Sequence, residues 1–158
     1  MATMARRGDI VGVWRVVAGD WVAMAVKSDL EGVGRFVDRE EIERRTPGET
    51  TDLFTRMVGV DLVRDGCNPV ERYVALRSGR QTSLTGRFDP CVPERCYPQV
   101  VVDGLIVHRS GRFPARVDHL VNTDALAGIE VYPGQAGVPA QYSGTSSTCG
   151  IVLFWTRR

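Results

Sequence analysis

The sequence predicts an α+β fold with a small mixed β-sheet, short helices and long loops. Short runs of Val, Ile, Leu, Phe, Trp and Tyr recur along the chain, as in strands that pack on a core. Capped segments with helical spacing interrupt these runs, and 17 Gly and 8 Pro residues supply the turns. The chain has 158 residues, without an internal repeat or a long linker, which suits one domain.

The composition excludes several classes of protein. Hydrophobic residues make up 43% of the chain and charged residues 25%, so it can bury a core of ordinary size. The formal net charge of +1 provides no strong field for nucleic acid or an anionic membrane. No apolar run reaches the ~20 residues of a membrane helix. The two histidines, His108 and His119, are eleven positions apart and lack the Asp or Glu spacing typical of a metal site.

The last thirty residues carry the strongest strand signals. Ile129–Tyr132 is one strand-forming run, and Ile151–Thr156 is a second that is almost continuously apolar. A continuous apolar run predicts a strand covered on both faces. We therefore expect the chain to complete its core only when this last strand is in place.

The N-terminal third predicts a hairpin and a capped helix. Residues 10–17 and 21–26 are strand-like runs joined by a short turn, within an N-terminal flank of residues 1–34. Asp38 can cap a helix that reaches residue 45, and Glu41 can complete a capping box with it. Pro47 should end this helix.

A second helix is expected directly afterwards. Thr46 would be its cap and Pro47 its first residue, with a carboxylate at Glu49. Three apolar side chains at helical spacing mark its buried face, and Gly59 should end it; they are Leu53, Phe54 and Met57. Residues 60–63 and 71–77 then predict two strands.

The clearest local signal is a hairpin over Val100–Val107. Two apolar runs are joined by Asp103 and Gly104, a pair that favours a type I′ turn because both central residues need positive φ. Asp103 is therefore expected to be a turn residue and not a catalytic acid. Residues 78–99, before the hairpin, should be irregular.

Two further elements are expected between this hairpin and the last strands. Residues 112–122 have apolar side chains at roughly helical spacing, which predicts a helix. Residues 123–127 predict a capped short helix that Gly128 ends, so that the next strand begins at Ile129.

The four cysteines predict two disulfides and hence a compartment outside the cytosol. They are Cys67, Cys91, Cys96 and Cys149, and no second pair of ligands completes a zinc set. Four cysteines allow three pairings. We favour Cys91–Cys96 with Cys67–Cys149, and the alternative is Cys96–Cys149, because both of these residues precede strands.

Several ordered segments together resemble the plug domain of TonB-dependent outer-membrane receptors. The likeness covers residues 35–158. It lies in a helix that ends before Val60, a Val-Asp-Gly hairpin, an Ile-Glu-Val strand, a Tyr-Gly motif and a closing strand. In that order, these segments are Thr50–Val60, Val100–Val107, Ile129–Gly134, Gln141–Gly144 and Gly150–Thr156. Its structural motif residues are Asp103, Gly104, Glu130, Gly134 and Gly150. The resemblance implies that Glu130 is a structural partner of an arginine, with Arg77 or Arg157 as candidates; the alternative is that Glu130 is a carboxylate that binds a ligand. Val58 stands where the family prefers proline.

The resemblance implies a non-enzymatic module of a bacterial envelope receptor, placed in the outer membrane or the periplasm. Such a module would act in ligand uptake or gating, and its partners would be an outer-membrane β-barrel, a TonB-type protein or a carboxypeptidase-regulatory-like domain. The alternative is a freestanding secreted or periplasmic binding module that kept the fold without transport. No catalytic, cofactor-binding or metal-ligating residues are expected, since no acid–base pair, nucleophile motif or phosphate loop occurs.

Overall fold

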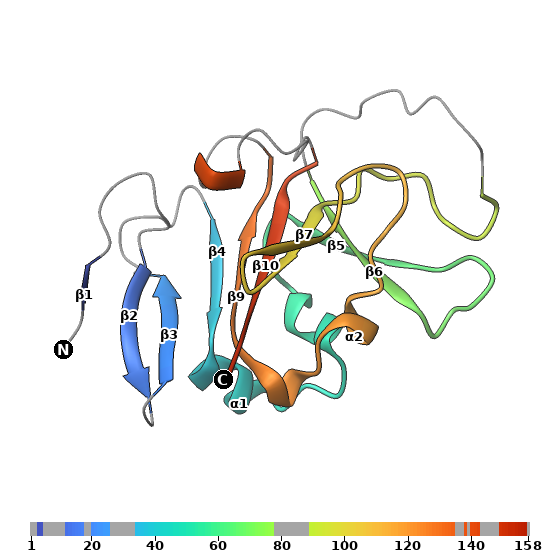
Figure 1. Cartoon of the computed structure of the whole chain (residues 1–158). Helices are drawn as coiled ribbons and strands as arrows, with labels where there is room; N and C mark the ends of the chain where they lie inside the picture. Colours follow the sequence, from blue (N-terminus) through green and yellow to red (C-terminus); the bar gives the residue numbers. More distant parts are fainter. Residues whose placement is uncertain are drawn as a thin grey trace.

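The computed structural model describes residues 3–4, 12–17, 20–25, 34–77, 89–134, 138, 140–142 and 149–157 (Figure 1). Its elements in chain order are β1 Thr3–Met4, β2 Gly12–Val17, β3 Asp20–Ala25, β4 Arg35–Asp38, α1 Arg39–Arg45, the 3₁₀ helix η1 Thr50–Phe54, β5 Val60–Arg64, β6 Arg72–Leu76, β7 Gln99–Val102, β8 Leu105–His108, α2 Val117–Leu120, the 3₁₀ helix η2 Thr123–Ala125, β9 Leu126–Tyr132, the 3₁₀ helix η3 Ala140–Tyr142 and β10 Ile151–Thr156.

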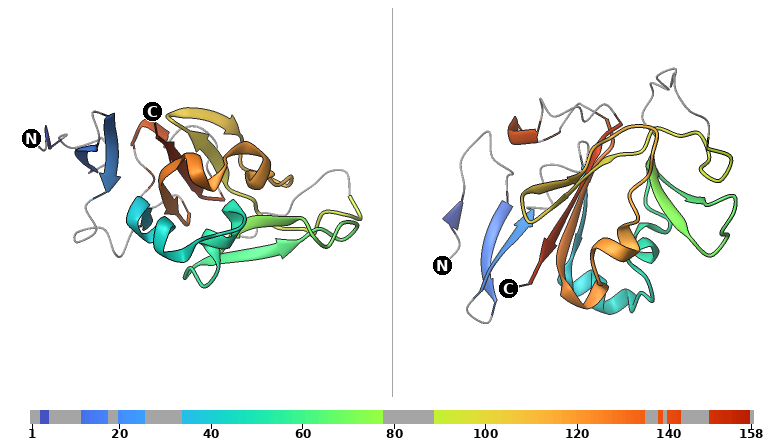
Figure 2. Two further views of the ribbon diagram at one scale, coloured as in Figure 1. Left: turned by 90° about the horizontal axis from the view of Figure 1, so that it is seen from below. Right: turned by 45° about the vertical axis from the view of Figure 1, so that its right-hand side comes forward.

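The described strands form three sheets, and the largest is mixed. Its order is β4-β9-β10-β7-β8, with β10 antiparallel to β9 and parallel to β7. The strands β1-β2-β3 form a second sheet, and β5 pairs with β6 in a third. The N-terminal strands lie on one side of the five-stranded sheet and the β5–β6 pair on the other (Figures 1 and 2). The α+β prediction is confirmed.

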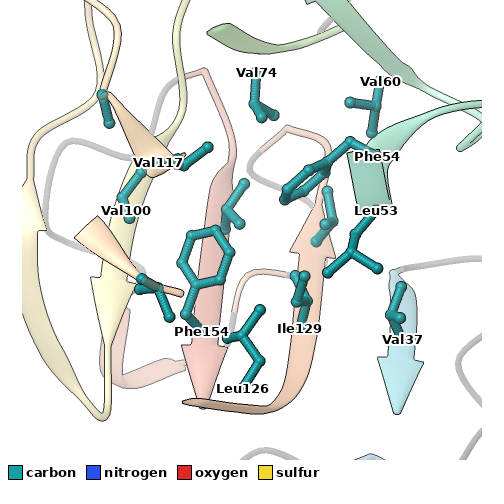
Figure 3. Packing of buried hydrophobic residues seen from close by; sticks show 14 of the residues in the cluster. Val37, Leu53, Phe54, Val60, Val74, Val100, Val117, Leu126, Ile129 and Phe154 are labelled. Carbon is teal, nitrogen blue, oxygen red and sulfur yellow. The ribbon is translucent and has the colours of Figure 1, made fainter. Parts of the chain in front are cut away.

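The last strand is the centre of the core, as its apolar sequence predicted. The first four residues of β10, Ile151–Phe154, are buried on both faces. Figure 3 shows Phe154 among side chains from β4, β9 and η1 that point into one cluster. The rings of Phe54 and Phe154 meet edge to face with their centroids 6.1 Å apart. Removing β10 would therefore expose both β9 and β7.

Local signals near the N-terminus are confirmed where the structure describes them. β2 and β3 pair antiparallel as the expected hairpin. The Asp38 carboxylate accepts a hydrogen bond from the Glu41 N–H at 2.8 Å and caps α1. The helix ends at Arg45, and Thr46 follows with φ of 43°.

The predicted second helix is shorter than expected and begins later. η1 is a 3₁₀ helix that starts at Thr50, because a capping box of Glu49 and Asp52 satisfies its first N–H groups. Thr46 is not its cap. Leu53 and Phe54 are buried as predicted, and Met57 packs partly buried after the helix has ended. Gly59 follows with φ of 84° and leads into β5.

The expected helix over residues 112–122 is also wrong. Only Val117–Leu120 is helical, and Phe113 is 52% exposed, so its apolar spacing does not mark a buried face. β9 begins at Leu126, three residues earlier than predicted, and Gly128 lies inside this strand. A Cβ atom on Gly128 would lie 3.1 Å from the Val37 carbonyl oxygen, so glycine permits the close approach of β4.

Some expectations fall on residues that lie outside the described ones. The irregular segment 78–99 is described only from residue 89 onwards, and the motif at residues 141–144 only over its first two positions. None of the described helices is long and apolar enough to cross a membrane.

Candidate functional site

The Asp-Gly turn joins the β7–β8 hairpin to the last strand. Asp103 and Gly104 have φ of 49° and 85°, as a type I′ turn requires. The Asp103 carboxylate accepts hydrogen bonds from the Thr156 N–H at 2.8 Å and from the Thr156 hydroxyl at 2.5 Å. The Asp103 N–H donates to the Phe154 carbonyl oxygen at 2.9 Å. Asp103 is thus both a turn residue and an anchor for the end of β10.

Glu130 is buried in the middle of β9 and is held by two neutral donors. It is 2% exposed, and its carboxylate accepts hydrogen bonds from the Tyr132 hydroxyl at 2.7 Å and from Trp155 Nε1 at 2.8 Å. Burial raises the pKa of Glu130, although both hydrogen bonds act in the opposite direction. Burial also raises the pKa of the Tyr132 hydroxyl, and the neighbouring Glu130 charge adds to this effect.

The expected pairing of Glu130 with Arg77 or Arg157 is wrong. The Arg77 guanidinium lies 2.7 Å from Asp61 in the two-stranded sheet, and the Arg157 guanidinium donates to the carbonyl oxygen of Asp124. The sequence places Arg77 directly after β6, and β6 does not belong to the sheet that contains Glu130. This difference in sheet could not be read from residue types.

Two of the three motif glycines, Gly150 and Gly134, meet different surroundings. Gly150 has φ of 87°, and a Cβ atom there would lie 2.5 Å from the Tyr132 carbonyl oxygen and 2.7 Å from Leu76. Gly134 has φ of 90°, but no described atom would lie within 4 Å of its Cβ. Gly150 is therefore required by both backbone conformation and space, and Gly134 by conformation alone.

The four cysteines form two disulfides, but the favoured pairing is wrong. Cys67 is bonded to Cys91, and Cys96 to Cys149, so the alternative pairing proposed for Cys96 is the one observed. Parallel pairing of β7 with β10 brings the starts of these strands together, with Ile151 opposite Gln99. Cys96 and Cys149 precede those starts. Cys91 instead lies against the β5–β6 turn, where its carbonyl oxygen accepts from the Gly66 N–H at 2.6 Å.

A charged groove of about 520 Å³ lies beside the β5–β6 turn. Its walls come from the start of η1, the β5–β6 turn and the region of α2; they are Glu49, Arg64, Asn68, Pro69, Val70, Glu71, Arg72, Arg116, Asp118 and His119. Arg72 pairs with Asp52 at 2.8 Å, and Arg116 pairs with Glu71 at 2.9 Å. The lining contains both acidic and basic groups, so the groove presents both signs of charge to a ligand.

Hydrogen bonds from the backbone and from side chains fix the walls of this groove. The Asp118 carboxylate accepts from the Thr51 N–H at 2.7 Å and from its hydroxyl at 2.9 Å, which joins α2 to η1. Burial acts to raise the pKa of Asp52, but hydrogen bonds from the Glu49 N–H and the Arg72 guanidinium outweigh it, and the pKa is lowered. These hydrogen bonds and the Arg72–Asp52 ion pair therefore hold η1, α2 and β6 together around the groove.

The β5–β6 turn is organised by one carboxylate. Asp65 accepts hydrogen bonds from the Tyr73 hydroxyl at 2.5 Å and from the N–H groups of Cys67 and Asn68, each at 2.7 Å. These hydrogen bonds, with that of Tyr73 the largest, hold the pKa of Asp65 below its usual value. Burial and the Asp65 hydrogen bond raise the pKa of Tyr73 to about 12.

An apolar patch lies at the outer edge of the five-stranded sheet. We call it the β8 edge patch; its members are Leu105, Ile106, Val107 and Phe113, which are 72%, 37%, 46% and 52% exposed. Within the described residues β8 pairs only with β7. A hydrogen bond of 2.8 Å between His108 Nε2 and the Phe113 carbonyl oxygen holds Phe113 beside the strand. Sequence patterning had assigned Val100–Val107 to the sheet without showing that its second strand would be uncovered.

Metal-binding groups do not gather anywhere in the part of the chain that the structure describes. No set of three His, Cys, Asp or Glu side chains there could hold a metal ion. The two histidines are apart, since His108 belongs to β8 and His119 to the rim of the charged groove.

No family model matches this sequence, and no curated protein is similar to it. Solved structures are similar in fold. They include the ferric enterobactin receptor PfeA of Pseudomonas aeruginosa, with 19% identity, 80% of this chain and 18% of that chain covered, and a TM-score of 0.52. The hemophore receptor HasR of Serratia marcescens is 15% identical, with 80% of this chain and 17% of that chain covered and a TM-score of 0.51. The siderophore receptor PirA of Acinetobacter baumannii is 18% identical, with 82% of this chain and 18% of that chain covered and a TM-score of 0.51.

This chain spans less than a fifth of the length of those three receptors. At such low identity the similarity concerns the fold. The expected resemblance to the plug domain of TonB-dependent receptors is confirmed at that level: the chain has a plug-like fold.

Proposed function

We propose that this chain is a non-enzymatic plug-like module of a bacterial envelope receptor, acting in ligand uptake or gating within a larger assembly. Residues 35–158 would form the plug-like unit, and residues 1–34 a flank that leads to a neighbouring domain. The observation that carries the proposal is the β8 edge patch, on a fold shared with receptors of siderophores and heme.

The β8 edge patch supports a permanent neighbour. Edge strands of freestanding proteins are usually protected by charged residues, proline or a covering segment, because unpaired N–H and C=O groups attract other strands. β8 has three consecutive apolar residues, and Leu105 is 72% exposed. Among the described residues, the one feature that protects the β8 edge against pairing with another strand is a β-bulge in its pairing with β7, between Val100 and Val101. An apolar surface of this kind marks a site of association, and the wall of an outer-membrane β-barrel is the partner that the fold favours.

The charged groove is the surface that we assign to the ligand. Arg64 and Arg116 can donate to anionic or oxygen-rich groups, while Glu49 and Asp118 can accept from donors. Pairing within the walls leaves a pre-organised surface, so a ligand would not have to order these side chains on binding. A TonB-type protein or a carboxypeptidase-regulatory-like domain would act from the N-terminal flank.

The alternative function is a freestanding secreted or periplasmic binding module. The two disulfides favour it, because such bonds persist in oxidising compartments and stabilise small exported domains. The two functions share the charged groove and differ in whether the β8 edge patch is covered.

Membrane association in the native host separates the two proposals. We would compare the wild-type chain with Leu105→Glu, and with Val58→Glu as a control at an apolar residue that is 70% exposed elsewhere. The receptor proposal predicts that the wild type and the control sediment with the outer membrane, whereas Leu105→Glu is released with an unchanged circular-dichroism spectrum. Recovery of all three proteins as soluble periplasmic monomers would refute it and favour the alternative.

A further inference from the structure

The backbone of Ile106 faces the free edge of the five-stranded sheet. A two-residue turn joins β7 to β8, so the residues that flank the turn, Val102 and Leu105, exchange hydrogen bonds as the first pair of the ladder. The next pair in an antiparallel ladder does not exchange hydrogen bonds, and here it consists of Val101 and Ile106. The N–H and carbonyl groups of Ile106 therefore point away from β7, toward the open edge.

The β-bulge directs the following residues of β8 back toward β7. Val101 lies opposite Ile106 in the hairpin. Val100 lies opposite His108, so Val107 is the extra residue of the bulge. Two residues of a bulged strand oppose one residue of the partner strand, and here Val107 and His108 oppose Val100. The bulge therefore leaves Ile106 as the residue of β8 at which another strand can pair, and it fixes the register of that pairing.

Apolar side chains extend from β8 on both faces of the sheet. Leu105 and Ile106 are successive residues of one strand, so they point to opposite faces, and they are 72% and 37% exposed. With Val107 and Phe113 they expose on the order of 400 Å² of apolar surface, about half of the ~800 Å² that each partner buries in a stable interface. Side chains alone would therefore bind a neighbour weakly, whereas an added strand contributes backbone hydrogen bonds as well as contacts on both faces.

β8 itself has the properties that an added strand needs. Such a strand must have apolar side chains on both faces and a free edge of its own, and within the described residues β8 has both. When two copies of β8 pair antiparallel about a two-fold axis, Ile106 lies opposite Ile106 of the second copy. Each Ile106 N–H then donates to the carbonyl oxygen of the other, which gives two hydrogen bonds across the axis.

Charge at the two ends of β8 favours the antiparallel arrangement. Asp103 lies in the turn before the strand, and Arg109 follows the strand with an exposed side chain. Two-fold pairing brings the Arg109 end of each copy toward the Asp103 end of the other, so opposite charges approach each other. A parallel arrangement would place Arg109 beside Arg109 of the second copy, and like charges directly opposite one another are destabilising.

We propose that two copies of this chain associate through β8, in an antiparallel pair centred on Ile106 that joins their five-stranded sheets into one. The proposal goes beyond the receptor function and does not rest on it. A barrel wall over the β8 edge patch would cover the same side chains, so the paired form belongs to the chain when it is apart from such a partner. A partner that binds β8 must then displace the second copy.

Sedimentation equilibrium of the full chain with both disulfides intact tests the association. As the protein concentration rises, the wild type should pass from the mass of one chain toward the mass of two. Leu105→Glu puts a charge against the apolar strand of the second copy and should keep the mass of one chain. Val58→Glu, at an apolar residue that is 70% exposed elsewhere, should behave as the wild type. A wild type that remains a single chain at its highest soluble concentration would overturn the proposal, and so would equal association of Leu105→Glu.

Ile106→Pro separates strand pairing from contact between apolar side chains. Proline lacks the N–H group that points away from β7, so the β7–β8 hairpin should persist, because proline is tolerated on edge strands where its nitrogen faces solvent. Both hydrogen bonds across the two-fold axis are lost, and self-association should weaken by about tenfold or more. Ile106→Val keeps the N–H group and should associate like the wild type. Equal association of Ile106→Pro and Ile106→Val would refute the strand pairing.

Cross-linking at Ile106 tests the register without removing a hydrogen bond. All four cysteines are held in disulfides, so a cysteine introduced by substitution is the thiol that a maleimide reagent attacks. Opposite Cα atoms in a hydrogen-bonded antiparallel pair are ~5.5 Å apart, so a short bismaleimide should join two copies of Ile106→Cys and leave Val58→Cys as single chains. Cross-linking of both variants, or of neither, would overturn the centre at Ile106. Sedimentation with the outer membrane is a separate measurement, so failure of the pairing and failure of the receptor function can be told apart.

Discussion

Replacing Asp103 tests how the β7–β8 hairpin is tied to the end of β10. Its carboxylate accepts two hydrogen bonds from Thr156, and its backbone is left-handed with φ of 49°. A hydrogen bond to a charged group contributes about 1.5–3 kcal/mol, and the left-handed conformation costs most residues ~1–2 kcal/mol while Asp and Asn tolerate it. Asp103 is partly exposed, so water can replace part of the hydrogen bonding that a substitution removes. The lower ends of both energy ranges therefore apply.

These contributions give different expectations for three variants. Asp103→Ala should lower the free energy of unfolding by about 3 kcal/mol, because it loses both hydrogen bonds and the tolerance of positive φ. Asp103→Asn keeps the tolerance and one acceptor oxygen, and should cost about 1 kcal/mol. Thr156→Val removes the hydroxyl but keeps the N–H, and should also cost about 1 kcal/mol.

Urea unfolding with both disulfides intact, followed by tryptophan fluorescence, measures these changes. The double variant of Asp103→Ala with Thr156→Val should cost about 1 kcal/mol less than the two single changes together, since the shared hydrogen bond can be lost only once. Equal costs for Asp103→Ala and Asp103→Asn, with no coupling to Thr156, would refute the anchoring role and leave Asp103 as a turn residue alone.

Two further predictions concern the closing strands. Gly150→Ala should destabilise the fold by more than ~3 kcal/mol, because its Cβ would lie 2.5 Å from a backbone oxygen. Gly134→Ala has the same sign of φ but open space around its Cβ, and should cost only ~1 kcal/mol. Similar thermal melting temperatures for the two variants would contradict the packing around Gly150. Glu130→Gln should flatten the dependence of stability on pH. The pKa of Glu130 is raised in the fold above the value of 4.5 for a free side chain, so the folded state binds the proton more tightly than the unfolded state. Wild-type stability should therefore fall by up to about 1.4 kcal/mol per pH unit as pH rises from 4.5 through the raised pKa. The lowered pKa of Asp65 acts in the opposite direction, since it removes stability only as pH falls below about 4. Urea unfolding between pH 3 and pH 9 separates the two, and identical pH profiles for Glu130→Gln and the wild type would refute the role of Glu130.

Local features were predictable because neighbouring residues decide them. The Asp38 cap of α1 involves a residue only three positions away, and the Asp103–Gly104 turn follows from the backbone preferences of two adjacent residues. The helix predicted from Thr46 was wrong for a related reason. A second local solution, the capping box of Glu49 and Asp52, satisfies the same backbone groups, and the packing of Leu53 and Phe54 under β10 favours it.

The features that bear on function depended on distances between segments far apart in the sequence. Trp155, which donates a hydrogen bond to Glu130, lies 25 positions away on the neighbouring strand. The charged groove combines residues 49, 64–72 and 116–119, and no spacing within the sequence marks them as a group. The exposure of the β8 edge patch follows from the outer position of β8 in the sheet, which a run of apolar residues does not specify.

The sequence by itself determined the α+β class, the apolar closing strand, the Asp-Gly hairpin and the resemblance to plug domains, because each depends on local preferences and on the order of segments. Only the tertiary structure decided that Cys67 pairs with Cys91 and Cys96 with Cys149. Disulfide formation requires Cα atoms to lie within a few ångströms. The parallel alignment of β7 with β10 brings Cys96 and Cys149 to that distance, and such an alignment exists only once the whole sheet has formed.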